Sequence, residues 1–134
     1  MQLDIQNALN DRLKSYVSSS GDVVAWEGMN FTPKAGIPHL KAFNLPGRAD
    51  VRGLGPDGMT QTPGVYQIDC VFPMGQGHGP AKAKADAIAA WFPRGLQLIA
   101  EHPNLRVKLA TVGPGIPDGG WYTVPVTVLW IAYL

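Results

Sequence analysis

The sequence has no marked excess of charge of either sign. Its 134 residues contain 11 Lys and Arg against 10 Asp and Glu, a formal net charge of +1 at pH 7. Broad attraction to nucleic acid or to an anionic membrane requires a basic field, which this balance does not supply. We therefore expect no membrane partner and no sequence-specific nucleic-acid partner.

Cysteine is nearly absent, and the histidines are scattered. The one cysteine, Cys70, has no intrachain partner, which suits a reducing compartment and a packing role. His39, His78 and His102 are far apart and lack the short spacings of metal ligands. We expect no metal site.

The sequence also lacks a catalytic motif. There is no G-x-S-x-G segment, and the acids Asp57, Asp69 and Asp118 belong to different segments. Cys70 has no neighbouring base in the sequence that would activate it as a nucleophile. We expect no enzymatic activity and no cofactor.

No apolar run is long enough for a membrane helix. The longest, residues 121–134, falls short of the ~20 residues that such a helix needs, and its Thr, Val and aromatic content favours a strand. The first residues show no basic segment followed by an apolar stretch, so we expect no secretory signal and synthesis in the cytoplasm. The length suits one domain, residues 1–134.

Two segments have helical periodicity. Apolar residues recur at three- and four-residue spacing from Ile5 to Val17, which predicts a helix that ends near 18–21. Pro80 suits the first turn of a second helix that ends at the sequence PRG, 93–95. The residues expected to line its buried face are Ala81, Ala85, Ile88, Ala89 and Phe92.

Alternating segments predict strands at 22–26, 39–45, 65–72, 105–112 and 121–134. In 65–72 the core face holds Tyr66, Ile68, Cys70 and Phe72. In 105–112 one face holds Leu105, Val107 and Leu109. The last two strands should form a hairpin whose tip is 113–120, whereas 47–63 has no sustained period and is predicted to be a long Gly- and Pro-rich loop.

The segment 71–92 has the order strand, glycine loop and helix, as in a phosphate-binding loop. Gly75, Gly77 and Gly79 precede Lys82 and Lys84. However, the segment lacks the Ser or Thr of a P-loop and the third glycine of a dinucleotide motif. We therefore favour a rigid strand-to-helix turn without a bound phosphate, with anion binding at the helix start as the weaker alternative.

The final strand has apolar side chains on both faces. One face holds Val124, Val126, Val128 and Trp130, and the other holds Thr127, Leu129, Ile131 and Tyr133. Two helices on one side cannot cover both faces. Either another subunit covers the second face or the long loops do, and the sequence favours neither.

Four stretches together resemble small tail-terminator-like proteins of long-tailed bacteriophages. They are VVAWEGMNFTPKAGIPHL, TPGVYQIDCVFPMGQGHG, ADAIAAWFPRG and GGWYTVPVTVLWIAY, and they span nearly the whole chain. The most specific pieces are Trp26 with Asn30, Phe31, Thr32 and Pro33, the strand and turn at 64–77, and the helix stop at 92–95. None of these pieces is a catalytic motif.

The resemblance implies an α+β fold, with two helices packed on a mainly antiparallel sheet and long Gly/Pro-rich loops. It also implies a structural virion protein at the head-proximal end of the tail. There a hexameric ring would cap the tail tube, stop its polymerisation and join a head–tail connector or neck protein. Genome DNA would pass through the ring.

If the resemblance holds, the two loops supply contacts to neighbouring subunits, the tube or the connector. The residues expected to do so are Arg48, Asp50, Arg52, Asp57, Met59, Pro114, Ile116 and Asp118. Arg48 and Arg52 would pair with acidic groups. Solvent-exposed loops without a partner remain the alternative.

Two other functions stay open. A neck or head-completion protein of the same virion would share the loops and the ring. A small phosphate- or nucleotide-binding enzyme would have to hold its ligand in the segment from Gly75 to Lys84.

Overall fold

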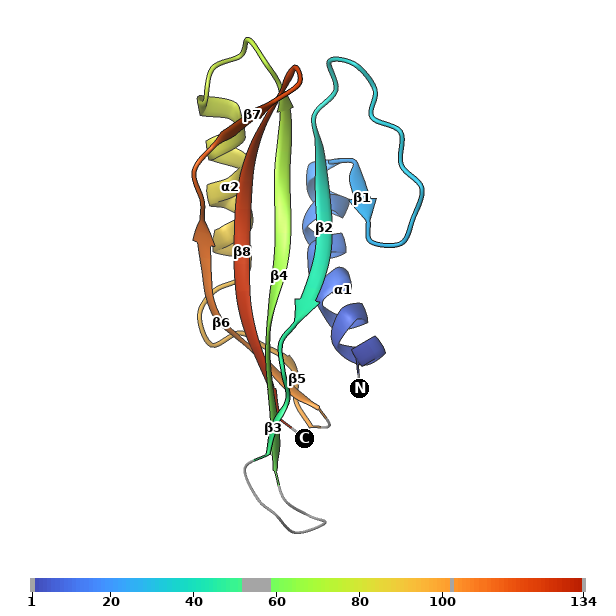
Figure 1. Ribbon diagram of the computed structural model, residues 1–134, viewed down its shortest axis with the longest axis vertical. Coiled ribbons are helices and arrows are strands. Elements are labelled where there is room, and N and C mark those ends of the chain that lie inside the picture. The colour runs from blue at the N-terminus through green and yellow to red at the C-terminus, as the bar shows by residue number, and fades with distance from the viewer. Residues whose placement is uncertain (1, 52–58, 102, 134) are drawn as a thin grey trace.

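The computed structural model describes residues 2–51, 59–101 and 103–133. Two helices and eight strands follow one another along the chain (Figure 1). In order they are α1 (Gln2–Ser20), β1 (Val24–Trp26), β2 (His39–Pro46), β3 (Asp50–Val51), β4 (Thr60–Pro73), α2 (Gly79–Trp91), β5 (Gln97–Ile99), β6 (Asn104–Val112), β7 (Ile116–Asp118) and β8 (Trp121–Tyr133).

All eight strands belong to one curled sheet. Its order is β1-β2-β4-β8-β6-β5, with β3 beside β4 and β7 beside β8. Only β1 and β2 pair in parallel, and every other pair is antiparallel. The predicted α+β class with a mainly antiparallel sheet is confirmed.

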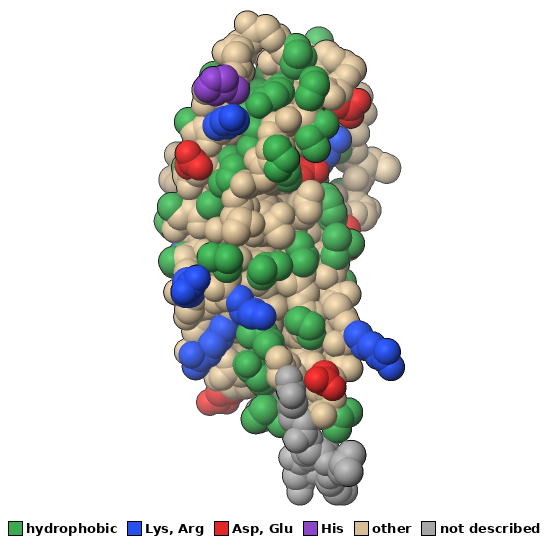
Figure 2. All heavy atoms as spheres, turned by 60° about the vertical axis from the view of Figure 1, so that its left-hand side comes forward, with side chains coloured by type: hydrophobic (Ala, Val, Ile, Leu, Met, Phe, Trp, Pro, Cys, Tyr) green, Lys and Arg blue, Asp and Glu red, His purple; other side chains and the backbone are tan. Residues whose placement is uncertain are grey.

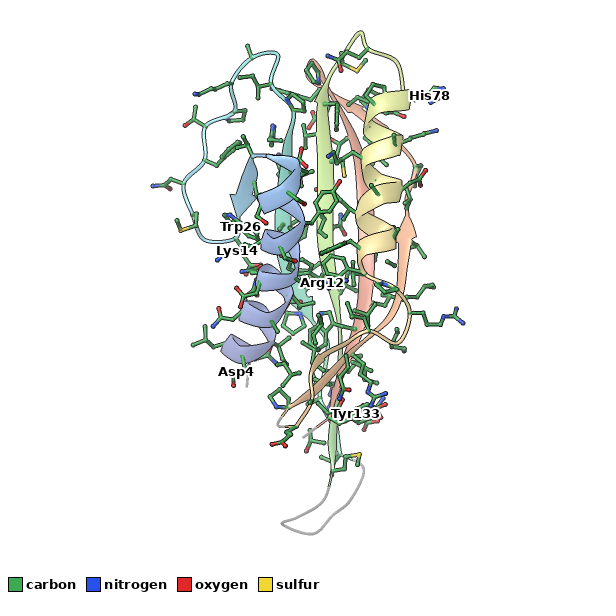
Figure 3. All side chains as sticks on the ribbon, turned by 180° about the vertical axis from the view of Figure 1, so that it is seen from behind. Asp4, Arg12, Lys14, Trp26, His78 and Tyr133 are labelled. Atoms are coloured by element: carbon green, nitrogen blue, oxygen red, sulfur yellow. The ribbon has the colours of Figure 1, made fainter. Side chains whose placement is uncertain are left out.

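Both helices lie on the same face of the sheet, which we call the inner face (Figures 1 and 3). Ile5, Leu9 and Leu13 recur every four residues on α1 and are fully buried against this face. The helix ends at Gly21, which has a positive φ of 76° and donates its N–H to the Val17 carbonyl at 2.8 Å. The opposite face, which we call the outer face, carries no helix.

The second helix begins as the sequence predicts. Gly75 and Gly77 have positive φ in the turn after β4, and Pro80 lies in the first turn of α2. Small Ala81 and Ala85 are fully buried and let the helix approach the sheet closely. The predicted strand-to-helix connection is confirmed.

Arg12 and Trp91 fasten the two helices to each other. The Arg12 guanidinium donates to the Trp91 carbonyl from Nε at 3.0 Å and from Nη2 at 2.7 Å. Trp91 Nε1 donates in return to the Arg12 carbonyl at 2.9 Å, and the guanidinium carbon lies 4.2 Å from the centre of the indole. The guanidinium thus donates hydrogen bonds to a carbonyl at the end of α2, where backbone carbonyls lack partners within the helix and the helix dipole favours positive charge.

The central strands β4 and β8 hold the largest buried side chain in place. Trp130 on β8 is fully buried, and its Nε1 donates to Asn44 Oδ1 on β2 at 2.9 Å. Its ring lies over Gly64 of β4, where an added Cβ would come within 2.1 Å of the indole. The packing therefore requires glycine at position 64. Through this contact and its hydrogen bond to Asn44, Trp130 joins β8 to β4 and β2.

The predicted long loop at 47–63 is wrong in part. Strand β4 starts at Thr60, five residues before the predicted start at Val65, and Asp50–Val51 forms β3 beside it. Pro63 is tolerated inside β4, and it accepts a hydrogen bond from the Gly47 N–H through its carbonyl at 2.7 Å. The rest of the loop, with Arg52 and Asp57, lies outside the described residues.

The predicted alternation of β6, with Leu105, Val107 and Leu109 on one face, is also wrong at one position. Leu105 and Val107 are buried, but Leu109 is 36% exposed. The register with β8 shifts between Val107 and Leu109, so an extra residue enters β6 there. A bulge of this kind moves the following side chains to the other face, and Leu109 therefore faces outward.

We predict that Gly64→Ala will lower the free energy of unfolding by about 2–3 kcal/mol, because the new methyl group overlaps the Trp130 ring. Denaturant unfolding measures this. The matched control is Gly79→Ala, because a Cβ at Gly79 in α2 meets nothing within 4 Å. The control should be neutral or slightly stabilising. Equal effects of the two substitutions would contradict the assigned role of Gly64.

We also predict a loss of stability at alkaline pH. Burial, with a further contribution from Asp69, raises the pKa of the Cys70 thiol from its ordinary 9.0 to about 12. Because folding raises this pKa, the contribution of the neutral thiol to the free energy of unfolding is fully present below pH ~9 and is lost as the pH rises towards 12. In this range the free energy of unfolding should fall by about 1.4 kcal/mol per pH unit. Cys70→Ala should remove this slope between about pH 9 and 10, and an unchanged slope would refute its assignment to the thiol.

Candidate assembly surfaces

A row of aliphatic side chains crosses the outer face. The register places Leu109 of β6 opposite Leu129 of β8, Leu129 opposite Val65 of β4, and Val65 opposite Leu45 of β2. Leu45 is 54% exposed and Leu109 is 36% exposed. Four neighbouring strands therefore present one apolar line to solvent, because both helices cover the inner face.

An open groove runs beside this row. Its lining residues are Leu45, Gly47, Pro63, Gly64, Val65, Lys108, Leu129 and Trp130. Gly64 and the buried Trp130 lie at its floor, between the exposed side chains of the row. We call the groove, with Leu109 and the nearby basic residues Arg48 and Arg106, the outer patch.

The basic residues of the outer patch come from its two sides. Lys108 lines the groove itself, Arg106 pairs in register with Ile131 of β8, and Arg48 lies beside Pro63. Figure 2 shows Lys and Arg side chains among hydrophobic ones in the lower half of the molecule. The outer patch therefore combines apolar surface with positive charge.

The predicted contact residues form two groups at opposite ends of the molecule (Figure 1). Arg48, Asp50 and Met59 lie near the β3–β4 pair at the lower end, and Met59 is 51% exposed. The structure does not bring them together with the second group, whose members are Pro114, Ile116 and Asp118. Arg52 and Asp57 lie outside the described residues.

The second group belongs to the upper end. Ile116 and Asp118 are exposed on β7, an edge strand that pairs with β8, so the predicted hairpin tip is partly strand. The Met74 N–H donates to the Gly120 carbonyl at 2.9 Å, which joins the glycine turn to the β7–β8 turn. Met74 is 51% exposed and Ile116 is 54% exposed. The upper end thus presents apolar side chains on joined turns.

The segment between β1 and β2 closes one end of the outer face. His39 is buried between two rings, with the Phe31 centroid at 5.0 Å and the Trp121 centroid at 5.2 Å. Burial, followed by the charge of Lys41, lowers the pKa of His39 and favours the neutral ring. The wide spacing of the histidines argued against a metal site at His39 but did not predict this packing role.

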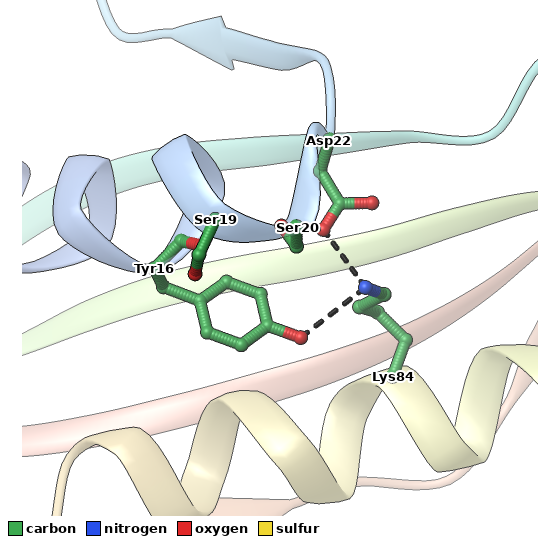
Figure 4. Close-up of polar contacts among 5 residues, drawn as sticks. All are labelled: Tyr16, Ser19, Ser20, Asp22 and Lys84. Atoms are coloured by element: carbon green, nitrogen blue, oxygen red, sulfur yellow. Dashed lines mark hydrogen bonds and ion pairs between the residues drawn. The ribbon is translucent and has the colours of Figure 1, made fainter.

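The glycine turn does not leave both of its lysines available for an anion. Lys84 Nζ lies 2.8 Å from Asp22 Oδ2 and donates to the Tyr16 hydroxyl at 3.2 Å (Figure 4). Burial lowers the pKa of Lys84, but the hydrogen bonds to Asp22 and Tyr16 outweigh this effect and leave it raised. Lys84 therefore fastens α2 to the end of α1, whereas Lys82 is exposed.

Two further features bear on function. Among the residues that the structure describes, no His, Cys, Asp and Glu side chains gather into a group that could hold a metal ion. Neither α1 nor α2, as described, has the length and apolar content to cross a bilayer.

Comparisons with known proteins identify a family and solved structures of similar fold. Residues 4–130 match the family model described as phage tail terminator protein. A solved structure whose name states no function has a TM-score of 0.80 and 27% sequence identity, and the match covers 98% of this chain and 95% of that one. No curated protein matches the chain.

We predict that phosphate and nucleotides will not bind the glycine turn, because it lacks a hydroxyl and a third glycine and Lys84 is already paired. A ligand at 100 times its Kd stabilises a protein by about 2.7 kcal/mol, which corresponds to several degrees in Tm. Millimolar phosphate or ATP should leave Tm unchanged. A dose-dependent rise that Gly77→Val abolishes would overturn the prediction.

Proposed function

The chain belongs to the phage tail terminator family, and on this premise we propose that it forms a hexameric ring on the head-proximal end of the tail tube. The family is structural, and its members are components of the virion tail. In the proposed role the ring stops tube polymerisation and provides the surface to which a head–tail connector or neck protein binds. The match over residues 4–130 carries this proposal.

The uncovered outer face supports assembly from many copies. A row of aliphatic side chains from Leu45 to Leu109 stays in contact with solvent in the isolated chain. Contiguous apolar surface of this kind commonly marks a protein interface. When one surface of a copy binds a different surface of the next copy, the contact can repeat. The copies form a closed ring if the rotation from each copy to the next adds up to a full turn.

The two ends of the molecule fit two axial partners. We assign Arg48, Asp50 and Met59 at the lower end to one partner, and Pro114, Ile116 and Asp118 at the upper end to the other. One partner is the tube protein and the other is the connector or neck protein. The opposite positions of the two groups support a ring that is held between a tube and a head (Figure 1).

The remaining parts of the proposal concern the chain as a whole. Residues 1–134 act as one domain, which the shared sheet of all described strands supports. The protein is made in the host cytoplasm, has no catalytic activity and needs no cofactor. Genomic DNA passes through the ring without sequence recognition, in keeping with the formal net charge of +1.

We predict that the purified protein will stop the growth of tail tubes in solution. Tube protein that polymerises alone should give tubes of unlimited length, and added terminator should give shorter tubes with a ring at one end. Electron microscopy measures the lengths and the ring. Tubes that keep growing, with no protein at their ends, would contradict the proposal.

Variants at the two ends refine this experiment. Met59→Asp and Ile116→Asp place a charge on exposed positions, so the fold should be kept. One variant should fail to cap tubes, and the other should cap tubes that do not join heads. A terminator that binds the neck but never the tube would instead support a neck or head-completion role.

A further inference from the structure

The outer patch has a preferred sign of charge as well as an apolar groove. Three basic residues, Arg48, Arg106 and Lys108, are exposed around it, and one acid, Asp50, lines the same pocket as Arg48, so positive charge is in excess. The acid of β4 on this face, Asp69, lies at a different level, where the register sets it opposite Lys41. A partner that fits the patch therefore carries an apolar side chain flanked by carboxylates.

The first half of α1 presents such a surface on the other side of the molecule. Leu3 is 71% exposed, and Asp4, Asn7 and Asp11 are exposed beside it. Asn7 is four residues from Leu3 and three from Asp4, and Asp11 is four residues further on, so these positions share one side of the helix, opposite Ile5 and Leu9. Leu3 is therefore an exposed aliphatic side chain with two acids along the same side.

The other helix fits the patch less well. The exposed side of α2 holds Lys82 and Asp86 among alanines, so its charges balance and it offers no large apolar side chain. Arg94 follows at its carboxyl end and adds positive charge. A basic patch would gain little from this helix.

The outer patch and the first half of α1 lie at the same level along the molecule. Figure 3 places Asp4 between Arg12 and Tyr133 along the long axis. Leu129 precedes Tyr133 by four residues in β8, about 13 Å along a strand, which brings the groove to the level of the first turns of α1, on the other face of the sheet. Copies related by rotation about an axis parallel to this length would meet at equal levels.

We propose that the first half of α1 from a second copy of the chain lies on the outer patch, with Leu3 in the groove and Asp4 and Asp11 beside Lys108 and Arg106. This inference rests on the proposed ring and names the surfaces that build it. Because the two surfaces lie on opposite faces of one sheet, each copy uses both at once, and the contact repeats head to tail.

Cross-linking tests the contact directly. Leu3→Cys and Leu45→Cys place one thiol on each of the two proposed surfaces, and the native Cys70 is buried. A bridge within one copy would give only a monomer-sized band. On rings bound to tube ends, the double variant with a short bis-maleimide should give a ladder of covalent multimers. Each single variant is the control and should give none. A double variant without a ladder would overturn the proposal.

Charge reversal gives an independent test. Asp11→Lys and Lys108→Glu should each weaken ring assembly by about tenfold or more, because like charges then face each other. The two reversals combined in one chain should restore it. Lys82→Glu on α2 is the matched control and should assemble as the wild type does. Single reversals that assemble normally, or a combination that rescues nothing, would refute the contact.

The outcomes separate this inference from the function on which it rests. Wild-type rings on tube ends, with normal assembly of the reversed variants, would overturn the contact and leave the terminator role intact. A wild-type chain that stays monomeric in solution, on tubes and in virions would overturn both.

Discussion

The contact between Trp130 and Gly64 is the constraint on which most of the fold depends. The indole occupies the space that a side chain at position 64 would take, and its N–H reaches Asn44 at 2.9 Å. One side chain therefore sets the spacing of β8, β4 and β2. Gly64 and Trp130 also lie at the floor of the groove in the outer patch, so this packed contact underlies the surface that the strands present.

The second constraint is that both helices pack on the same face. Arg12 and Trp91 bind the helices to each other, and Lys84 with Asp22 and Tyr16 binds them again further along. With this layer complete, the outer face has no helix left to cover it. The described residues thus form two layers, with one face of the antiparallel sheet left open to solvent.

Much of the fold could be predicted because the signals are local. The four-residue spacing of Ile5, Leu9 and Leu13 predicted α1, and Pro80 predicted the start of α2. The strand start at Thr60 was missed because Pro63 and Gly64 are typical of loops, and only tertiary pairing with β8 overrides that preference.

The candidate surfaces were harder to predict for a physical reason. Leu109 belongs to the outer face only because a bulge shifts its register, and no local pattern predicts a bulge. The row from Leu45 to Leu109 depends on the registers of three strand pairs, which cannot be read from the sequence. By contrast, Ile116 and Met59 were predicted as contact residues from their loops alone, and only the fold places them at opposite ends of the molecule.

The central claim is that this chain ends the tail tube. The most direct test is the length of tails in infected cells that carry the phage with this gene disrupted. We expect overlong tails that vary in length and carry no head, with normal length restored by supplying the wild-type protein. Tails of normal, uniform length joined to heads in the absence of the protein would contradict it.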